Sequence, residues 1–200
     1  MEKTEEIKDE IKVVEVEKKE DWRDVLRFII ISLLIVIPIR MYVAKPFIVE
    51  GTSMFPTFHN GDYLIVDQIS YIISGKVNRG DVVVIKPPMD ESKYFIKRLI
   101  GLPGDTIMIN GSEVKIINKE HPLGVILDEP YVENKGNDNN LLFVVPEDQY
   151  FVMGDNRTAS YDSRGWGFLP KKDLVGKALV RLFPPKSIDL LPGKFDQSLK

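Results

Sequence analysis

The stretch PGDTIMINGSEVKII, residues 103–117, indicates how this chain folds. Two runs rich in β-favouring residues, TIMI and SEVKII, flank Asn110-Gly111. This dipeptide favours a two-residue hairpin turn, because both central positions of that turn take positive φ. The stretch therefore predicts a protruding β-ribbon.

The Gly-Asp pair of this stretch recurs before other apolar runs. It opens NGDYLIVDQISY at residues 60–71 and RGDVVVIK at residues 79–86, as expected where a turn feeds into a strand. QYFVM (149–153) and KALVRLF (177–183) predict further strands, and no long soluble helix is evident. Arg79-Gly80-Asp81 also matches a short adhesion motif, but a plain turn is the stronger interpretation. The sequence thus predicts a mainly β protein.

Composition excludes several classes of protein. The 200 residues can bury a sizeable core, and the net charge of -3 argues against binding of nucleic acid through its phosphates. The absence of cysteine excludes disulfide scaffolds, thiolate zinc sites and cysteine nucleophiles. Only two histidines, His59 and His121, could serve in catalysis.

The N-terminal region combines a charged segment, residues 1–24, with an apolar run, residues 25–44. We interpret the first as a cytoplasmic tail and the second as a single transmembrane anchor, with Arg27 and Arg40 reaching the two interfaces. A buried core helix is less usual, because the run is apolar on every face. A cleaved signal peptide is disfavoured, since cleavage after Ala44 would place bulky Tyr42 where a small residue is needed.

The segment FIVEGTSMFPTF, residues 47–58, follows the apolar run and contains the candidate nucleophile Ser53. A serine nucleophile needs a base and a site that stabilises the oxyanion. A Ser-His-Asp triad could recruit His59 or His121, and a lysine could act instead. Ser53 could also simply cap a turn.

The candidate lysine is Lys97, within KYFIKRLIGLPGD, residues 93–105. A free lysine has a pKa of roughly 10.4, so a base at neutral pH needs a depression of about 3 units, which requires an apolar site. A third stretch, residues 153–170 (MGDNRTASYDSRGWGFLP), is dense in polar residues directly after an apolar strand. It predicts either a buried polar network around a site or an ordinary exposed loop.

These segments together resemble the type I signal peptidases of bacteria, in their Gram-positive-like form, which are membrane-anchored Ser-Lys proteases. GTSMFPT resembles the nucleophile box, FIKRLIGLPGD the general-base box and GDNRTASYDSRGWG the third box, in family order behind an N-terminal helix. The resemblance runs from the apolar run to about Phe183.

The resemblance implies a β-rich catalytic core formed by residues 45–105 and 145–185, a smaller inserted β-ribbon domain at 106–144, and a C-terminal tail at 186–200. The catalytic domain would lie outside the cytoplasmic membrane and act on secretory preproteins beside the lipid bilayer. No metal, other cofactor or nucleic acid is implied.

The resemblance also assigns roles to individual residues. Ser53 would be the nucleophile and Lys97 the general base, with Ser160 orienting the lysine and with Asp162 and Arg164 bracing the site. The segment 47–51 would pair with an extended substrate and give it pockets for small Ala-x-Ala-like side chains. The residues implied in substrate binding are Val49, Gly51, Met54, Phe58, Phe95 and Ile96. Gly51 stands where some members carry a serine that joins the oxyanion hole, so the backbone N–H of Ser53 is the expected main donor.

Two rival interpretations remain at the level of sequence. A self-cleaving repressor would share the Ser-Lys pair, but it would carry a DNA-binding domain in place of the apolar run. A membrane-tethered β-domain that binds extended peptides without catalysis would keep the same scaffold.

Overall fold

The computed structural model describes residues 22–38, 44–69 and 77–195, and the chain divides into two compact units, Met1–Ile39 and Arg40–Lys200. In the first unit the described element is helix α2 (Trp22–Pro38), whose large apolar side chains are exposed. No helix among the described residues is long and apolar enough to cross a membrane. Most of the predicted cytoplasmic tail, and residues 39–43 of the predicted anchor, lie outside the described residues.

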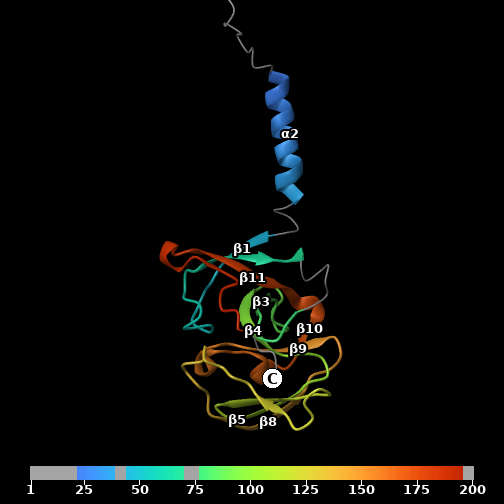
Figure 1. Cartoon of the computed structure of the whole chain (residues 1–200), viewed down its shortest axis with the longest axis vertical. Coiled ribbons are helices and arrows are strands. Elements are labelled where there is room, and N and C mark those ends of the chain that lie inside the picture. Colours follow the sequence, from blue (N-terminus) through green and yellow to red (C-terminus); the bar gives the residue numbers. More distant parts are fainter. Residues whose placement is uncertain (1–21, 39–43, 70–76, 196–200) are drawn as a thin grey trace, which may run out of the picture. The chain divides into compact units, whose positions relative to one another are not determined.

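The second unit is mainly β, as predicted, and its larger sheet is antiparallel and curled (Figure 1). The strands follow the order β1-β2-β11-β3-β4-β9-β10, and β12 pairs with β11. The predicted strands at 149–153 and 177–183 are confirmed as β9 and part of β11. The strands of this sheet are β1 (Ala44–Ile48), β2 (Tyr63–Asp67), β11 (Leu174–Phe183), β3 (Val82–Ile85), β4 (Phe95–Gly101), β9 (Gln149–Met153), β10 (Leu169–Pro170) and β12 (Asp189–Leu190).

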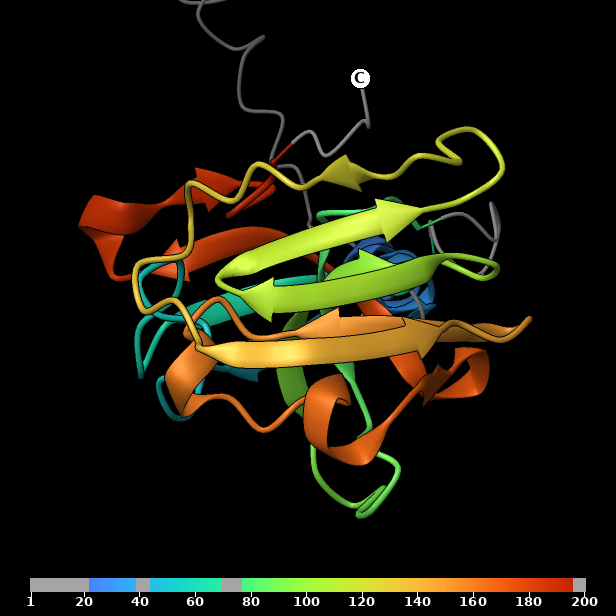
Figure 2. The same ribbon diagram turned by 90° about the horizontal axis from the view of Figure 1, so that it is seen from below.

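A second antiparallel sheet has the order β7-β6-β5-β8 and is viewed face-on in Figure 2. Its strands are β5 (Thr106–Gly111), β6 (Glu113–Ile117), β7 (Val125–Ile126) and β8 (Asp138–Val144). The predicted hairpin is confirmed as β5–β6, but Asn110 pairs with Glu113, so the turn residues are Gly111 and Ser112. Of these two only Gly111 has positive φ, at 62°. The turn is displaced by one residue because Asn110 stays in the ladder.

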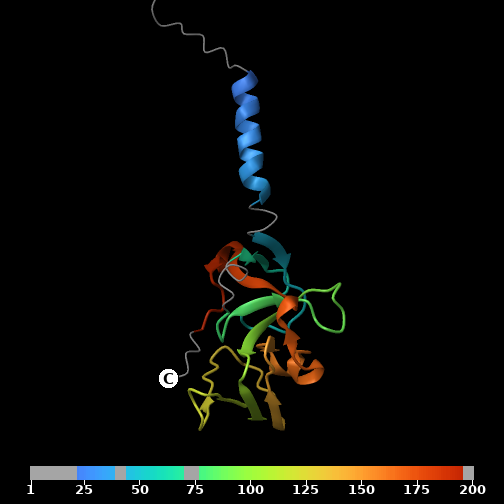
Figure 3. The same cartoon turned by 90° about the vertical axis from the view of Figure 1, so that its right-hand side faces the viewer.

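The two sheets pack together as layers over a shared core (Figure 3). Ile100 of β4 and Phe151 of β9 are fully buried against Ile107 of β5 and Ile116 of β6. Residues 106–144 supply all four strands of the smaller sheet. Both sheets nevertheless belong to one compact unit, so a separate inserted domain stays a prediction.

The three Gly-Asp pairs form the same local structure before β2, β3 and β5. In each, the aspartate carboxylate accepts a hydrogen bond from the backbone N–H three residues earlier, and the glycine has φ between 82° and 91°. Those N–H groups belong to His59, Asn78 and Leu102, at 3.0, 2.9 and 2.6 Å. The recurring motif is therefore a strand-entry turn that only glycine fits without strain. Arg79 and Asp81 of the adhesion-like motif are both buried in it.

In the described part of the second unit the helices are short. They are η3 (Arg157–Ala159), α4 (Ser163–Trp166), η4 (Lys171–Asp173) and η5 (Pro185–Ser187). The segment predicted as a C-terminal tail is partly packed on the core. Its Gly193 carbonyl accepts a hydrogen bond from Arg98 Nη1 at 2.6 Å, and the Phe195 ring lies 5.2 Å from that of Tyr131. Residues 196–200 lie outside the described residues.

Candidate active site

Ser53 lies in the turn-rich segment between β1 and β2, and this segment is fixed at both ends and in the middle. Val49 N–H donates to the Asp62 carbonyl at 2.9 Å and closes the base of the segment. Asn156 holds the middle, because its backbone N–H donates to the Ser53 carbonyl at 3.0 Å and its side-chain amide to the Thr52 carbonyl at 3.2 Å. The candidate nucleophile is therefore positioned by a residue 103 positions away in the chain.

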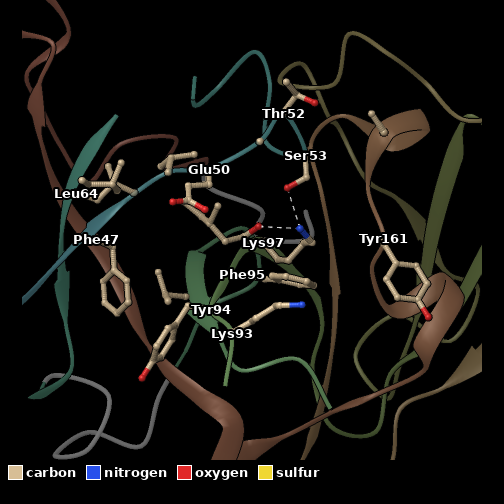
Figure 4. Close-up of a pocket in the computed structure, with 16 residues that line it drawn as sticks. Phe47, Glu50, Thr52, Ser53, Leu64, Lys93, Tyr94, Phe95, Lys97 and Tyr161 are labelled. Carbon is tan, nitrogen blue, oxygen red and sulfur yellow. Dashed lines mark hydrogen bonds between the residues drawn. The ribbon is translucent and has the colours of Figure 1, made fainter. Parts of the chain in front are cut away.

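Lys97 projects from β4 toward Ser53. Its Nζ donates a hydrogen bond to Ser53 Oγ at 2.8 Å and another to the Ile96 carbonyl at 3.1 Å (Figure 4). The lysine is only 3% exposed, and its Nζ lies 5.2 Å from the centre of the Phe95 ring. The structure thus brings together the two residues on which the sequence-based hypothesis of a Ser-Lys pair depends.

Burial changes the acidity of this lysine. Desolvation lowers the pKa of Lys97 from 10.5 to about 8, because the charged form loses its hydration. The negative charges of Asp162 and Asp155 oppose this change, and the positive charge of Arg164 adds to it. A substantial fraction of Lys97 is therefore neutral near pH 8 and able to accept a proton.

Asp162 and Arg164 form a paired support behind the lysine. Asp162 is 1% exposed, accepts hydrogen bonds from the Arg164 guanidinium at 2.9 and 2.8 Å, and accepts one from Gly154 N–H at 3.0 Å. Burial alone would raise the pKa of Asp162, but the bonds from Arg164 and Gly154 outweigh it and lower the pKa. The carboxylate therefore stays ionised and caps α4 at its N-terminus.

Ser160, predicted to orient the lysine, lies beside this pair. Its Oγ is buried and makes no hydrogen bond within the described part of the chain, although the hydroxyl is close enough to Asp162 to help lower that carboxyl's pKa. A Cβ on Gly154 would come within 2.3 Å of Ser160 Oγ and 2.4 Å of the Ser53 carbonyl oxygen. Glycine at position 154 therefore lets Ser160 and the backbone of Ser53 approach each other closely.

A second buried ion pair, Arg98–Asp155, lies next to the site. Arg98 and Asp155 are both fully buried and joined by two hydrogen bonds, at 2.8 and 2.6 Å. Asp155 also accepts a hydrogen bond from Thr57 Oγ1 at 2.5 Å, and the Arg98 guanidinium stacks 3.8 Å from the centre of the Tyr131 ring. Through Thr57, the pair connects β4 to the segment between β1 and β2 that contains Ser53.

Neither histidine lies at the candidate site. His59 is exposed and its ring contacts Phe55, while His121 sits in a turn after β6. Neither is among the hydrogen-bond partners of Ser53 or the residues of the cleft beside it. The described residues also contain no group of three or more histidines, aspartates and glutamates placed to hold a metal ion.

A cleft of about 620 Å³ runs beside Ser53 and Lys97. Four of the residues predicted to bind substrate line it, namely Val49, Gly51, Phe95 and Ile96. Met54 and Phe58 do not line it: they are 1% and 0% exposed and pack in a core cluster with Leu64, Val82 and Ala178. Phe47, Ile48 and Glu50, which belong to the segment 47–51 predicted to pair with the substrate, also line the cleft. The lining further includes residues to which the sequence gave no role in binding: Thr52, Leu64, Val84, Lys93, Tyr94, Ala159 and Tyr161.

These additional residues differ in how far the sequence could have indicated that they line the cleft. Leu64 and Val84 are apolar strand residues like many others, and only the curl of the sheet brings them to the cleft. The sequence could have suggested Tyr161 as a binding residue, because it is the aromatic residue inside the polar run TASYDSR. An aromatic side chain surrounded by polar neighbours is a common mark of a binding surface.

Comparison with known proteins identifies the family of this chain. Residues 22–183 match the family model described as signal peptidase, peptidase S26. The chain is 37% identical to a probable signal peptidase I-2 of Synechocystis, over 85% of this chain and 77% of that protein. It is 36% identical to signal peptidase I of Bacillus licheniformis, over 84% and 91%, and 38% identical to signal peptidase I P of Bacillus subtilis subsp. natto, over 84% and 92%. Because the family model covers most of the chain, the protein belongs to the signal peptidase family, peptidase S26.

Proposed function

We propose that this protein is a serine endopeptidase that removes N-terminal signal peptides from exported preproteins through a Ser53–Lys97 dyad. The observation that carries the proposal is the 2.8 Å hydrogen bond between Lys97 Nζ and Ser53 Oγ, made by a lysine that is 3% exposed. A nucleophile and a base within hydrogen-bond reach, with the base depressed in pKa by burial, meet the requirements of covalent catalysis.

The reaction takes place in two halves. Neutral Lys97 accepts the Ser53 hydroxyl proton while Oγ attacks the carbonyl carbon of the last signal-peptide residue. The resulting lysine ammonium then gives its proton to the departing amine and the C–N bond breaks. The mature protein is released, and the signal peptide remains bound to Ser53 Oγ as an ester. In the second half Lys97 removes a proton from water while the water oxygen attacks the ester carbonyl carbon. The C–Oγ bond of the ester then breaks, Lys97 returns the proton to Ser53 Oγ, and the signal peptide leaves with a free carboxyl group.

The developing oxyanion needs hydrogen-bond donors. The backbone N–H of Ser53 has no acceptor within the described part of the chain, which supports its role as the main donor. A donor of this kind contributes roughly 3 kcal/mol to transition-state stabilisation. Gly51, whose φ is 88°, provides no side-chain donor there.

The free strand edges of the larger sheet support a β-addition mode of substrate binding. Among the described residues, β1 is an edge strand, and β4 pairs with β9 only from Arg98 onward, which leaves that edge of β4 without a partner strand from Phe95 to Lys97. Residues of both edges line the same cleft. An extended signal-peptide end fits between them, with alternate side chains in apolar pockets at Val49 and Ile96. Narrow pockets exclude bulky side chains and explain a preference for small residues before the cut.

We further propose that residues 25–44 anchor the protein in the cytoplasmic membrane as a single span, with the catalytic unit on the extracytoplasmic side. Helix α2 exposes large apolar side chains along its length, from Val25 to Ile37, and 17 residues rise about 26 Å. Exposure of that kind is costly in water and favourable in lipid. Sharing a bilayer with the substrate raises the effective substrate concentration.

The test is cleavage of a fluorogenic Ala-x-Ala peptide, and of a full preprotein, in detergent micelles. Ser53→Ala and Lys97→Met should each lower turnover at least 1,000-fold, while the matched variants His59→Ala and His121→Ala keep most of it. A histidine variant as inactive as the serine variant would overturn the dyad. A folded wild type that binds these substrates without cutting them would favour the alternative, a tethered peptide-binding domain.

A further inference from the structure

Tyr161 occupies an unusual position in the cleft. Its side chain is 60% exposed, yet it lines the same cleft as Ser53 and Lys97. In Figure 4 its ring lies on the opposite side of Lys97 from Phe47 and Tyr94. The cleft therefore has an aromatic boundary on each side of the reacting pair.

The exposed ring is held in place by the chain around it. Asp162, the next residue, is 1% exposed and its carbonyl accepts hydrogen bonds from the backbone N–H groups of Gly165 and Trp166, at 2.8 and 3.1 Å. The Tyr161 ring rests on Gly165, where a Cβ would come within 2.7 Å of ring atom Cε2. Because the backbone is fixed and the ring has a support, a ligand that stacks on it immobilises little additional side-chain freedom.

The direction of the substrate decides which part of it meets this ring. In the proposed binding mode, the residues before the cut pair with β1 and with the Phe95–Lys97 part of β4, the edges that no other described strand occupies. Beyond Lys97 that edge is taken, because Arg98 pairs with Met153 of β9. In that binding mode the chain after the cut leaves the sheet and passes the segment that contains Ala159 and Tyr161, both of which line the cleft.

We propose that Tyr161 is a specificity-determining residue for the mature side of the substrate, favouring an apolar or aromatic side chain within the first few residues after the cut. The inference rests on the proposed peptidase function. Ring stacking of this type corresponds to a preference of about 2- to 13-fold in kcat/KM.

The experiment compares peptides that share one Ala-x-Ala signal end and differ only after the cut, with alanine, leucine, phenylalanine or aspartate scanned through the first four mature positions. Wild type should cleave the leucine and phenylalanine peptides several-fold faster than the alanine peptide at one of these positions. Tyr161→Ala should abolish that preference, and Tyr161→Phe, which keeps the ring, should retain it. Tyr94→Ala, a matched loss of an aromatic ring on the other side of Lys97, should leave the after-cut preference intact.

Each outcome bears on a separate claim. Equal cleavage of all peptides by wild type, or an unchanged preference in Tyr161→Ala, overturns the role of Tyr161 and leaves the peptidase function standing. A loss in Tyr161→Ala that is the same for every peptide also overturns it, since it indicates a structural effect. No cleavage of any peptide by folded wild type counts against the peptidase function itself.

Discussion

Lys97 Nζ lies 2.8 Å from Ser53 Oγ although the two residues are 44 positions apart, and the lysine reaches the serine from a strand on which it is almost fully buried. Burial has two consequences. It leaves a substantial fraction of the lysine beside the serine uncharged near pH 8, and between about pH 8 and pH 10.5 it makes the folded protein hold fewer protons than the unfolded chain.

The first prediction concerns the pH dependence of activity. Because the pKa of Lys97 is lowered to about 8, kcat/KM should rise roughly tenfold per pH unit below pH 8 and level off above it. Steady-state cleavage of the fluorogenic peptide between pH 6 and 10 measures this. A rate that is flat from pH 6 to 8 would show that another group is the base.

The second prediction uses the charges next to the lysine. Asp162 raises the pKa of Lys97 and Arg164 lowers it. Asp162→Asn, which can still cap α4, should move the pH profile to lower pH, while Arg164→Gln should move it to higher pH. Both variants should lose turnover through poorer positioning, so only the opposite directions of the profile shift are diagnostic. Shifts of the same sign would contradict the electrostatic assignment.

The third prediction concerns stability. At pH 7 Lys97 is protonated in both the folded and the unfolded protein, and its lowered pKa means that burying the charge costs about 3 kcal/mol of stability. This cost disappears as the pH rises from 8 to 10.5, because the buried lysine loses its proton before the lysine of the unfolded chain does. The free energy of unfolding of Lys97→Met minus that of wild type should therefore fall by about 3 kcal/mol between pH 7 and pH 10.5. Urea unfolding at several pH values measures the difference, in which all other titrating groups cancel. A constant difference would mean that Lys97 is not desolvated.

The fourth prediction separates positioning from stability by comparing two glycines. Gly154→Ala would place a Cβ 2.4 Å from the Ser53 carbonyl oxygen, and Gly176→Ala would place one 2.4 Å from the Asp67 carbonyl oxygen, in the β11–β2 ladder. Both should destabilise the fold by about 1–3 kcal/mol. Only Gly154→Ala should lower kcat, by at least tenfold, measured where both variants remain folded. Equal kcat values in the two variants would argue against a role for the 154–156 segment in holding Ser53.

The fifth prediction concerns the buried pair of Arg98 and Asp155. Removal of either partner alone, in Arg98→Met or Asp155→Asn, should cost about 3–5 kcal/mol, because it leaves a buried charge without its partner. The double variant should lose less than the sum of the two single losses. Chemical denaturation of all four proteins gives the coupling energy, and additive losses would indicate that the two charges do not interact.

The local motifs of the sequence determined much of this protein. The Gly-Asp pairs specify turns through the positive φ of glycine and the short reach of aspartate, so they predicted where strands begin. The apolar, β-favouring runs that follow these pairs predicted a mainly β fold, and the β5–β6 hairpin followed from Asn110-Gly111 except for a one-residue displacement of its turn. The three boxes around Ser53, Lys97 and Asp162 also indicated the family.

Only the tertiary structure decided which of these residues meet. The antiparallel order β1-β2-β11-β3-β4-β9-β10 joins strands far apart in the chain, and no local rule predicts such pairings. That order buries Met54 and Phe58, which the sequence had suggested as pocket residues, and it brings Leu64, Val84 and Tyr161 to the cleft. Lys97 shows why the sequence alone could not decide this. The sequence gives the residue and its position relative to Ser53, but the lowered pKa of Lys97 comes from desolvation, which depends on all the residues that pack around it in the folded protein.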